Sequence, residues 1–404
     1  MNTFRSPFRD EACRCLDSRY PLCCFLLTAF LLFGCGKRQE QGQPSTSSGT
    51  AAVAAREQSG ASSRPPLRYR SEVCIDRQGT GIEAFRMLVP SEWSFESGVI
   101  WILDNPGMPA TGWLRTKGPR SGEALEVFPN QSFFWTDNPM NKQMFPTGSK
   151  YFGAEVRQPV GAVDMLKSIV LRRFRKQAEG LSVVSAEHLP DLAASLGVKA
   201  GQNGIGRTDG GRVRISYARE GVRVDEDVYG VIESYGFPIQ SMYGAFTNVL
   251  WTGEFLIAMS APAGTLDSMG TLYRTMVTSI RVNPEWLSRY GQVVNYLIQN
   301  QMRAIRSAGE LSRIISRTHS EISDDMMRSW EGRQAVYDRL SESFSQNIRG
   351  VDEYYDPVNG RPVELPAGYQ NAWVNGLGEY VIADQVDFNP NVGSNQNWQR
   401  MEKK

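Results

Sequence analysis

The side chains that most often carry acid–base or nucleophilic chemistry are sparse in this sequence. It contains two histidines, His188 and His319. A catalytic triad would need one of them beside a nucleophile, and the Gly-x-Ser-x-Gly turn that presents such a serine does not occur. We expect surface or capping roles for both histidines. No H-E-x-x-H motif for zinc is present, and the sequence predicts no cofactor and no metal site.

Three glutamates on expected strands, Glu126, Glu233 and Glu254, are the candidates for hydrolytic chemistry. Glycan hydrolysis uses two carboxylates about 5–9.5 Å apart, and a sequence does not show whether any two of these meet. Because carboxylates on strands usually face solvent, we expect a protein that is not an enzyme. A cell-envelope hydrolase that uses these carboxylates is the alternative.

Cys35 is the residue with the clearest predicted chemistry. Residues 21–33, PLCCFLLTAFLLF, form an uncharged apolar run. A run of about 13 residues suits a signal sequence and is shorter than the ~20 residues of a membrane-spanning helix. The run ends in Leu32-Phe33-Gly34-Cys35, which resembles the bacterial lipobox, where a peptidase cleaves before a cysteine acylated on sulfur.

The lipobox resemblance implies a signal peptide over residues 1–34 and an extracytoplasmic chain that Cys35 anchors to a lipid membrane by fatty acyl groups. Ordinary secretory cleavage and a short buried helix are the alternatives. Processing would leave Cys74 as the single thiol of the mature chain. By the same resemblance, Gly36, in place of an aspartate, permits passage to an outer membrane. The long and nearly neutral segment before the apolar run leaves open whether Met1 is the true start.

The composition is that of an ordinary globular protein, with 41% hydrophobic residues, 22% charged residues and a formal net charge of +1. The near-zero charge argues against a nucleic-acid partner. Residues 35–66 are rich in Ser, Gly, Gln and Ala and cannot bury enough apolar area to fold. We expect them to be a disordered tether.

Residues 67–283 are expected to form an α+β domain with an antiparallel sheet. Short strands are predicted near 82–90, 99–103, 125–128 and 133–135, and helices at 162–180, 189–196 and 266–280. One hairpin is predicted around Gly221, between 212–220 and 223–233. Another is predicted around Thr252-Gly253, between 246–251 and 254–260.

The order of these elements resembles that of the PsbP-like α/β/α sandwich. Met87-Leu88-Val89-Pro90-Ser91-Glu92-Trp93 reads as a strand followed by P-x-x-W, and the late strand to Ala261-Pro262 leads into a helix that ends Thr278-Ser279-Ile280. The resemblance implies a fold that relatives use for binding and assembly.

Residues 284–349 read as a helical region that begins at Pro284 and carries narrow apolar stripes. Two arrangements are consistent with such stripes, namely helices that pack on each other and a coiled coil with a partner.

Residues 350–404 form an Asn- and aromatic-rich block with a predicted hairpin over 373–382. Its P-x-G-Y-x-x-x-W-x-N-G-x-G-E-Y run and D-F-N-P-N segment resemble the tail of a family of uncharacterised bacterial lipoproteins, which implies kinship without a mechanism. Asp387, Asn389 and Asn391 alternate as in a calcium loop, but Val392 and Trp398 replace the glycine and glutamate of an EF-hand, so turns are expected. The candidate binding surface is Trp373, Asn375, Tyr380 and Trp398, and the alternative is that the aromatic side chains form a small core.

From these features we expect a lipid-anchored binding or envelope-assembly protein with an envelope protein or glycan partner. The ligand, the choice of inner or outer membrane and the oligomeric state stay open.

Overall fold

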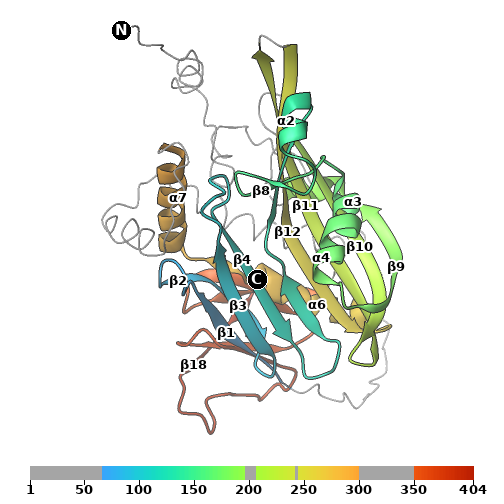
Figure 1. Cartoon of the computed structure of the whole chain (residues 1–404). Coiled ribbons are helices and arrows are strands. Elements are labelled where there is room, and N and C mark those ends of the chain that lie inside the picture. Colours follow the sequence, from blue (N-terminus) through green and yellow to red (C-terminus); the bar gives the residue numbers. More distant parts are fainter. Residues whose placement is uncertain (1–65, 196–205, 242–243, 300–349) are drawn as a thin grey trace, which may run out of the picture.

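The computed structural model describes residues 66–195, 206–241, 244–299 and 350–404. They form a strand-rich mixed α/β fold of three sheets with few helices (Figure 1). The expected combination of helices with antiparallel sheets is confirmed at this level. No helix within these ranges is both long and apolar enough to cross a membrane.

The largest sheet curves as a half-barrel around three long antiparallel strands, β10 (Gly206–Arg219), β11 (Val222–Ser241) and β12 (Gly244–Pro262). The hairpin predicted around Gly221 is formed by β10 and β11. Its turn residues Glu220 and Gly221 have φ values of 52° and 79°, as a two-residue hairpin turn requires. The other strands of this sheet are β3 (Ser94–Trp101), β4 (Ala110–Lys117), β5 (Ala124–Val127), β6 (Gln131–Thr136), β7 (Lys150–Tyr151), β8 (Ala154–Val156) and β9 (Glu179–His188).

The hairpin predicted at Thr252-Gly253 is wrong, because β12 continues through these residues. Gly253 instead allows close packing, since a Cβ there would lie 2.4 Å from the sulfur of Met165 on the helix above. Two residues later Phe255 has φ 50°, and the register with β11 shifts between Tyr229 and Val231. Such a bulge exchanges the faces to which the side chains before and after it point.

One face of the half-barrel is covered by a continuous helical segment. It consists of α3 (Ala162–Met165), a π-helical turn (Leu166–Val170) and α4 (Leu171–Phe174). The helix predicted to reach Gly180 therefore ends at Arg175, and Gly180 lies in β9 with φ 61°. The segment packs on buried side chains of the long strands, including Ile215 and Trp251.

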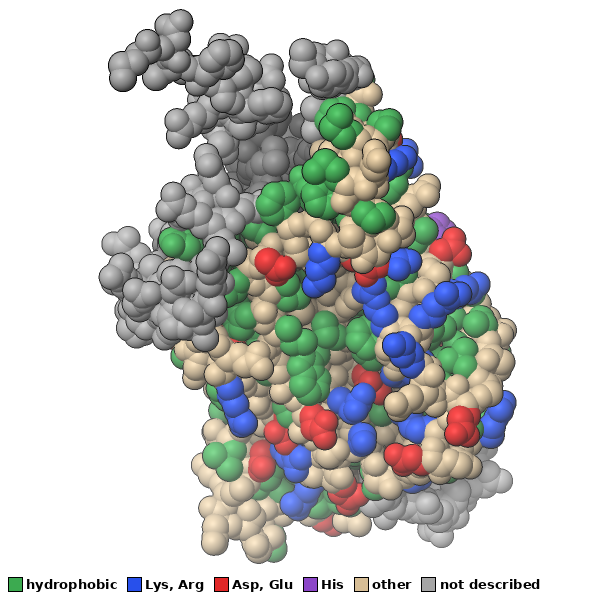
Figure 2. Space-filling model, viewed as in Figure 1, with side chains coloured by type: hydrophobic (Ala, Val, Ile, Leu, Met, Phe, Trp, Pro, Cys, Tyr) green, Lys and Arg blue, Asp and Glu red, His purple; other side chains and the backbone are tan. Residues whose placement is uncertain are grey.

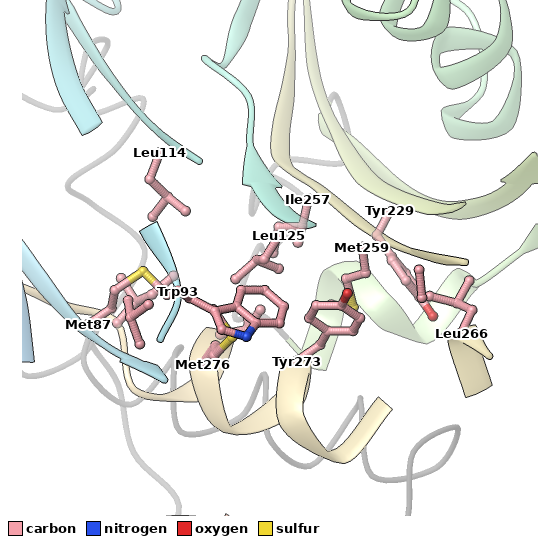
Figure 3. Packing of buried hydrophobic residues seen from close by; sticks show 14 of the residues in the cluster. Met87, Trp93, Leu114, Leu125, Tyr229, Ile257, Met259, Leu266, Tyr273 and Met276 are labelled. Atoms are coloured by element: carbon pink, nitrogen blue, oxygen red, sulfur yellow. The ribbon is translucent and has the colours of Figure 1, made fainter. Parts of the chain in front are cut away.

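The other face packs against α6 (Leu266–Thr278), close to the predicted helix 266–280. Figure 3 shows Tyr273 and Met276 of this helix beside Trp93 and Leu125. The rings of Trp93 and Tyr273 meet edge to face with centroids 6.0 Å apart. Each fully buried large apolar side chain of this kind contributes about 1.5–3 kcal/mol, so this cluster fixes α6 on the sheet.

A second sheet combines the first strands of the described chain with strands of the C-terminal block. β1 (Leu67–Ile75) pairs on one side with β2 (Glu83–Pro90) and on the other with β17 (Tyr380–Ala383), and Leu67 faces Ile382. The hairpin predicted over 373–382 is formed by β16 (Asn371–Asn375) and β17, so residues 350–404 share a sheet with the first strands. The sheet order is β13 (Arg281–Val282), β2, β1, β17, β16 and β18 (Trp398–Arg400).

The small third sheet consists of β15 (Arg361–Pro366), β14 (Val351–Asp356) and β19 (Glu402–Lys403), and β15 contacts α6. The short helices α2 (Pro139–Met144) and α5 (Pro190–Ser195) lie between strands. α7 (Pro284–Gln299) begins at the predicted proline. The rest of the predicted helical region, 300–349, lies outside the described residues.

Asp76 joins α7 to the first strands of the chain. Its carboxylate accepts hydrogen bonds from the indole N–H of Trp101 at 3.1 Å and of Trp286, on α7, at 2.9 Å. It also accepts the backbone N–H groups of Gly79 and Thr80. Asp76 is fully buried, so these donors replace the water that a buried carboxylate loses.

Candidate functional site

A cavity of about 330 Å³ lies where α6, β2 and the third sheet meet. Its volume is at the lower end of the range for small-ligand sites, roughly 300–1,000 Å³. Four guanidinium groups and two carboxylates line it, so the lining carries a net positive charge; these residues are Arg86, Arg274, Arg281, Arg361, Glu353 and Glu364. Met87, Leu88 and Val363 add apolar walls.

Two of the arginines are held by carboxylates. Arg274, which is 6% exposed on α6, donates from Nε and Nη2 to the two carboxylate oxygens of Glu364 at 3.0 and 3.2 Å. Arg86 on β2 makes the same two-pronged contact with Glu83 at 2.7 and 2.6 Å. Both pairs fix the positions of the guanidinium planes, and the Arg274–Glu364 pair connects α6 to β15 across the cavity.

Arg281 closes the end of α6. Its Nη1 donates to the carbonyl oxygens of Thr278 at 2.6 Å and Ile280 at 2.9 Å, where a helix leaves acceptors without partners inside the helix. A cation is also favoured there by the negative end of the helix dipole. Arg281 is therefore held beside the cavity by the backbone.

Arg361 lies at the first residue of β15. Its Nε is buried and has no hydrogen-bond partner among the described residues. Nearby, the hydroxyl of Tyr380 donates to Asp356 at 2.5 Å. Burial and Asp356 raise the pKa of Tyr380, and Arg361 acts in the opposite direction. A buried donor without an acceptor costs about 1–3 kcal/mol, so the Arg361 guanidinium is incompletely satisfied by the described residues.

The cavity thus combines fixed guanidinium groups, a net positive charge and apolar walls. Guanidinium groups present parallel donors whose spacing matches the oxygens of a carboxylate or a phosphate. The arrangement suits recognition of one acidic group that carries an apolar neighbour. Its two carboxylates face each other across the β14–β15 pair, where Glu364 is held by Arg274 and Glu353 pairs with Lys404 at 3.1 Å.

A second charged cluster is buried between α4 and the half-barrel. Arg175, 9% exposed, contacts Glu226 at 2.9 Å and Glu126 at 3.2 Å. Burial alone would raise the pKa of Glu126, but the neighbouring guanidinium groups of Arg175, Arg115 and Arg219 lower it overall. A general acid needs a raised pKa, so Glu126 is held as an ion-pair partner.

Glu233 and Glu254 lie on the opposite face of the half-barrel from Glu126. In the β11–β12 register Glu254 faces Val231, and Glu233 faces Thr252, two residues along. They are 9% and 5% exposed, and the hydroxyl of Tyr235 donates to Glu233. The bulge at Phe255 separates Glu254 from the face of Glu126, so the three predicted carboxylates form no single site.

The candidate binding surface of the C-terminal block is not exposed as predicted. Asn375 and Tyr380 are each 1% exposed and Trp398 is 6% exposed, while Trp373 is half-buried. Asn375 accepts the backbone N–H groups of Leu377 and Glu379 at 3.0 Å. Asn375 therefore holds a turn, and Tyr380 fills a core that it shares with aliphatic side chains such as Leu365 and Ile382.

The other predicted positions are structural or lie outside the described residues. Asn389 and Asn391 accept backbone N–H groups, as expected of turn residues. No group of metal-binding side chains occurs within the described ranges. His188 is exposed and contacts Asp209 at 2.5 Å. Cys35 and His319 lie outside the described residues.

The sequence patterns did not predict the arginine-lined cavity, whose arginines are distant from one another in the sequence. One signal was present, since Arg274 falls between Tyr273 and Met276 on the apolar side of a predicted helix. No protein-family model matches the chain, and no curated protein is significantly similar to it.

Proposed function

We propose that this chain is an extracytoplasmic binding or envelope-assembly protein, anchored to a membrane by acylated Cys35, that recognises an acidic group in the arginine-lined cavity. The main observation in support of this proposal is the cavity, which is lined by four guanidinium groups from β2, α6, β13 and β15 and by two carboxylates. The chain holds its partner, an envelope protein or glycan, without changing it. The PsbP-like order of strand, P-x-x-W and final helix supports this assignment, because such relatives serve in binding and assembly.

A titration tests the ligand class. The full chain in detergent is titrated calorimetrically with inorganic phosphate and with the tripeptide Ala-Ala-Ala, whose free carboxylate has apolar neighbours. At least one of the two should bind, and binding should weaken at high salt. Arg361→Gln should weaken it about tenfold, since a hydrogen bond to a charged group contributes about 1.5–3 kcal/mol.

The matched control is Arg120→Gln. Arg120 is an exposed arginine paired with Glu123 outside the cavity, so its loss should leave the affinity unchanged. Equal affinities of the wild-type chain and the Arg361→Gln variant would contradict the assignment, as would the absence of binding by both probes.

The anchor is tested separately by cell fractionation. Cys35→Ser should release the protein from the membrane fraction or leave it as an uncleaved precursor, and it should abolish labelling with a radioactive fatty acid. Unchanged labelling in this variant would show that Cys35 is not the acylated residue.

A cell-envelope hydrolase is the second candidate function. It is favoured by one observation, the two buried carboxylates Glu233 and Glu254 on neighbouring strands. Purified peptidoglycan incubated with the full chain would then release soluble fragments, and the Glu233→Gln and Glu254→Gln variants would not. Our leading proposal expects no release by any of the three proteins.

A further inference from the structure

The end of the half-barrel that carries α2 presents apolar side chains to solvent. We define this tip as α2 together with the turn between β7 and β8. Met140 and Met144 on α2 are each 64% exposed, and Phe152 in the turn is 52% exposed. Figure 2 shows hydrophobic side chains gathered at this end of the molecule. Single exposed apolar residues are ordinary, whereas a group on adjacent elements indicates a contact surface.

An aromatic stack holds the two parts of the tip together. The ring of Tyr151 stacks on buried Phe134 with centroids 4.1 Å apart. The same ring meets Phe145, next to α2, at 5.0 Å and Phe152 at 4.6 Å. The exposed side chains of the tip therefore lie on an aromatic cluster that connects α2 to the turn.

Phe152 adds an independent observation. Its φ is 47°, followed by Gly153 at 74°, which is the backbone of a turn that favours Asn or Gly at both positions. An exposed phenylalanine gains little from burial there and carries the strain of a left-handed backbone. A strained backbone that carries an exposed apolar side chain indicates that the side chain serves binding and not the stability of the fold.

The charge of the tip identifies the kind of partner. Residues 138–153 contain Lys142 and Lys150, both exposed, and no acidic residue. Lys142 lies over the ring of Trp135 at 5.1 Å. The flanking acidic residues are engaged elsewhere. Asp137 accepts the backbone N–H of Thr247. Glu155, opposite Lys150 in the β7–β8 register, pairs with Arg157 and Arg173. Exposed Met and Phe side chains together with Trp, Tyr and Lys are the composition of surfaces that enter the headgroup region of a bilayer.

We propose that the tip lies on the surface of a phospholipid bilayer that contains anionic lipids, as a second contact beside the lipid anchor. The methionine and phenylalanine side chains enter the headgroup region and the two lysines face lipid phosphates. The predicted tether of about 30 residues could extend to about 100 Å, long enough for this end to reach the membrane. The proposal does not depend on the ligand of the arginine-lined cavity.

The test compares two positions on the same vesicle-bound protein. The full chain carrying Met144→Cys is labelled with an environment-sensitive fluorophore and reconstituted into vesicles of phosphatidylcholine and phosphatidylglycerol. Val184→Cys, at a 59% exposed site on β9, is the matched control. Cys74 is fully buried, and the labelled chain without an introduced cysteine gives the background. Spin-labelled lipids then quench fluorophores that contact the bilayer.

Quenching at position 144 should be at least twofold stronger than at position 184. Adding Met140→Ser and Phe152→Asn should reduce it to the value at 184, and vesicles of phosphatidylcholine alone should give weaker quenching. Equal quenching at the two positions would overturn the proposal. The proposal would also be overturned if the fluorophore at position 144 reported an apolar environment without vesicles, and if that signal rose with protein concentration. A second copy of the chain would then cover the tip.

Discussion

At the scale of single residues, Arg175 shows how one side chain can decide the stability of a sheet. It is the cation between two buried carboxylates, Glu226 at 2.9 Å and Glu126 at 3.2 Å. Glu226 also accepts the hydroxyl of Tyr217 at 2.5 Å. Breaking a buried pair is costly, because the two carboxylates lose their most buried counter-ion and keep only the more exposed Arg115 and Arg219.

Arg175→Met should therefore lower the free energy of unfolding by about 3–5 kcal/mol, measured by urea denaturation at neutral pH. Arg172→Met, at an exposed position on the same α4 helix, is the control and should change it by less than about 0.5 kcal/mol. A similar small loss in both variants would show that the cluster is not needed for stability.

The same cluster predicts a pH dependence. The folded-state pKa of Glu126 is below its ordinary value of 4.5, so its contribution to stability is present above that pH and is lost as the pH falls through the folded value. The loss of unfolding free energy on acidification should be smaller in Arg175→Met. Without Arg175 the folded-state pKa of Glu126 is lowered less, so protonation of Glu126 costs the folded protein less. Urea titrations of both proteins between neutral and acidic pH check this, and parallel curves would contradict it.

Phe152→Asn tests the strained turn at the tip. Asparagine tolerates the left-handed backbone that Phe152 adopts at φ 47°. The variant should gain about 1 kcal/mol of stability while its contact with the bilayer weakens. Phe152→Val is the comparison, since a β-branched residue is disfavoured at positive φ and should destabilise the chain. Thermal unfolding in detergent measures both.

At the scale of elements, the position of α7 depends on the hydrogen bonds that converge on Asp76. Asp76→Ala should remove the acceptor of Trp286 and leave several buried donors without partners. We expect hydrogen exchange across α7 to become at least tenfold faster, while exchange in β10 and β11 changes little. Unchanged protection of α7 would show that apolar packing alone holds this helix.

The elements also show where sequence patterns succeed. Alternation and turn residues predicted the β10–β11 hairpin, the start of α7 at Pro284 and α6 nearly to its ends. They failed at Gly253, where glycine permits the approach of Met165 rather than a turn. They also failed at the end of the helix predicted to reach Gly180, since that helix stops at Phe174. The packing at Gly253 is a tertiary contact that a local pattern does not contain.

At the scale of the whole molecule, the first and the C-terminal strands of the described chain lie side by side in one sheet. The pairing of β1 with β17 places Leu67 opposite Ile382, so the C-terminal strands complete the sheet begun by the first strand. The cavity depends on the same closure, because β1, β2 and α6 supply one side of it and β14 and β15 the other. Its arginines are spread from Arg86 to Arg361, which is why no motif in the sequence predicted it.

A chain that ends at residue 349 should therefore not fold cooperatively, since β1 would lose its partner β17. Buried Tyr69 and Leu88 would also lose the apolar side chains of the C-terminal block that cover them. Thermal unfolding followed by circular dichroism should show a broad transition or aggregation. A chain that ends at residue 397, which lacks β18 and β19, is the milder comparison and should unfold cooperatively at a lower temperature. A sharp transition at the full-length temperature for the shorter chain would contradict this account.

The most direct measurement of the central claim locates an anion in the arginine-lined cavity. Crystals of the full chain grown with selenate, an oxyanion with a strong anomalous signal, should show an anomalous peak beside the guanidinium group of Arg361. The peak should be missing in crystals of Arg361→Gln. Selenate bound only at other surfaces, or bound equally in the variant, would contradict the proposal that this cavity recognises an acidic group.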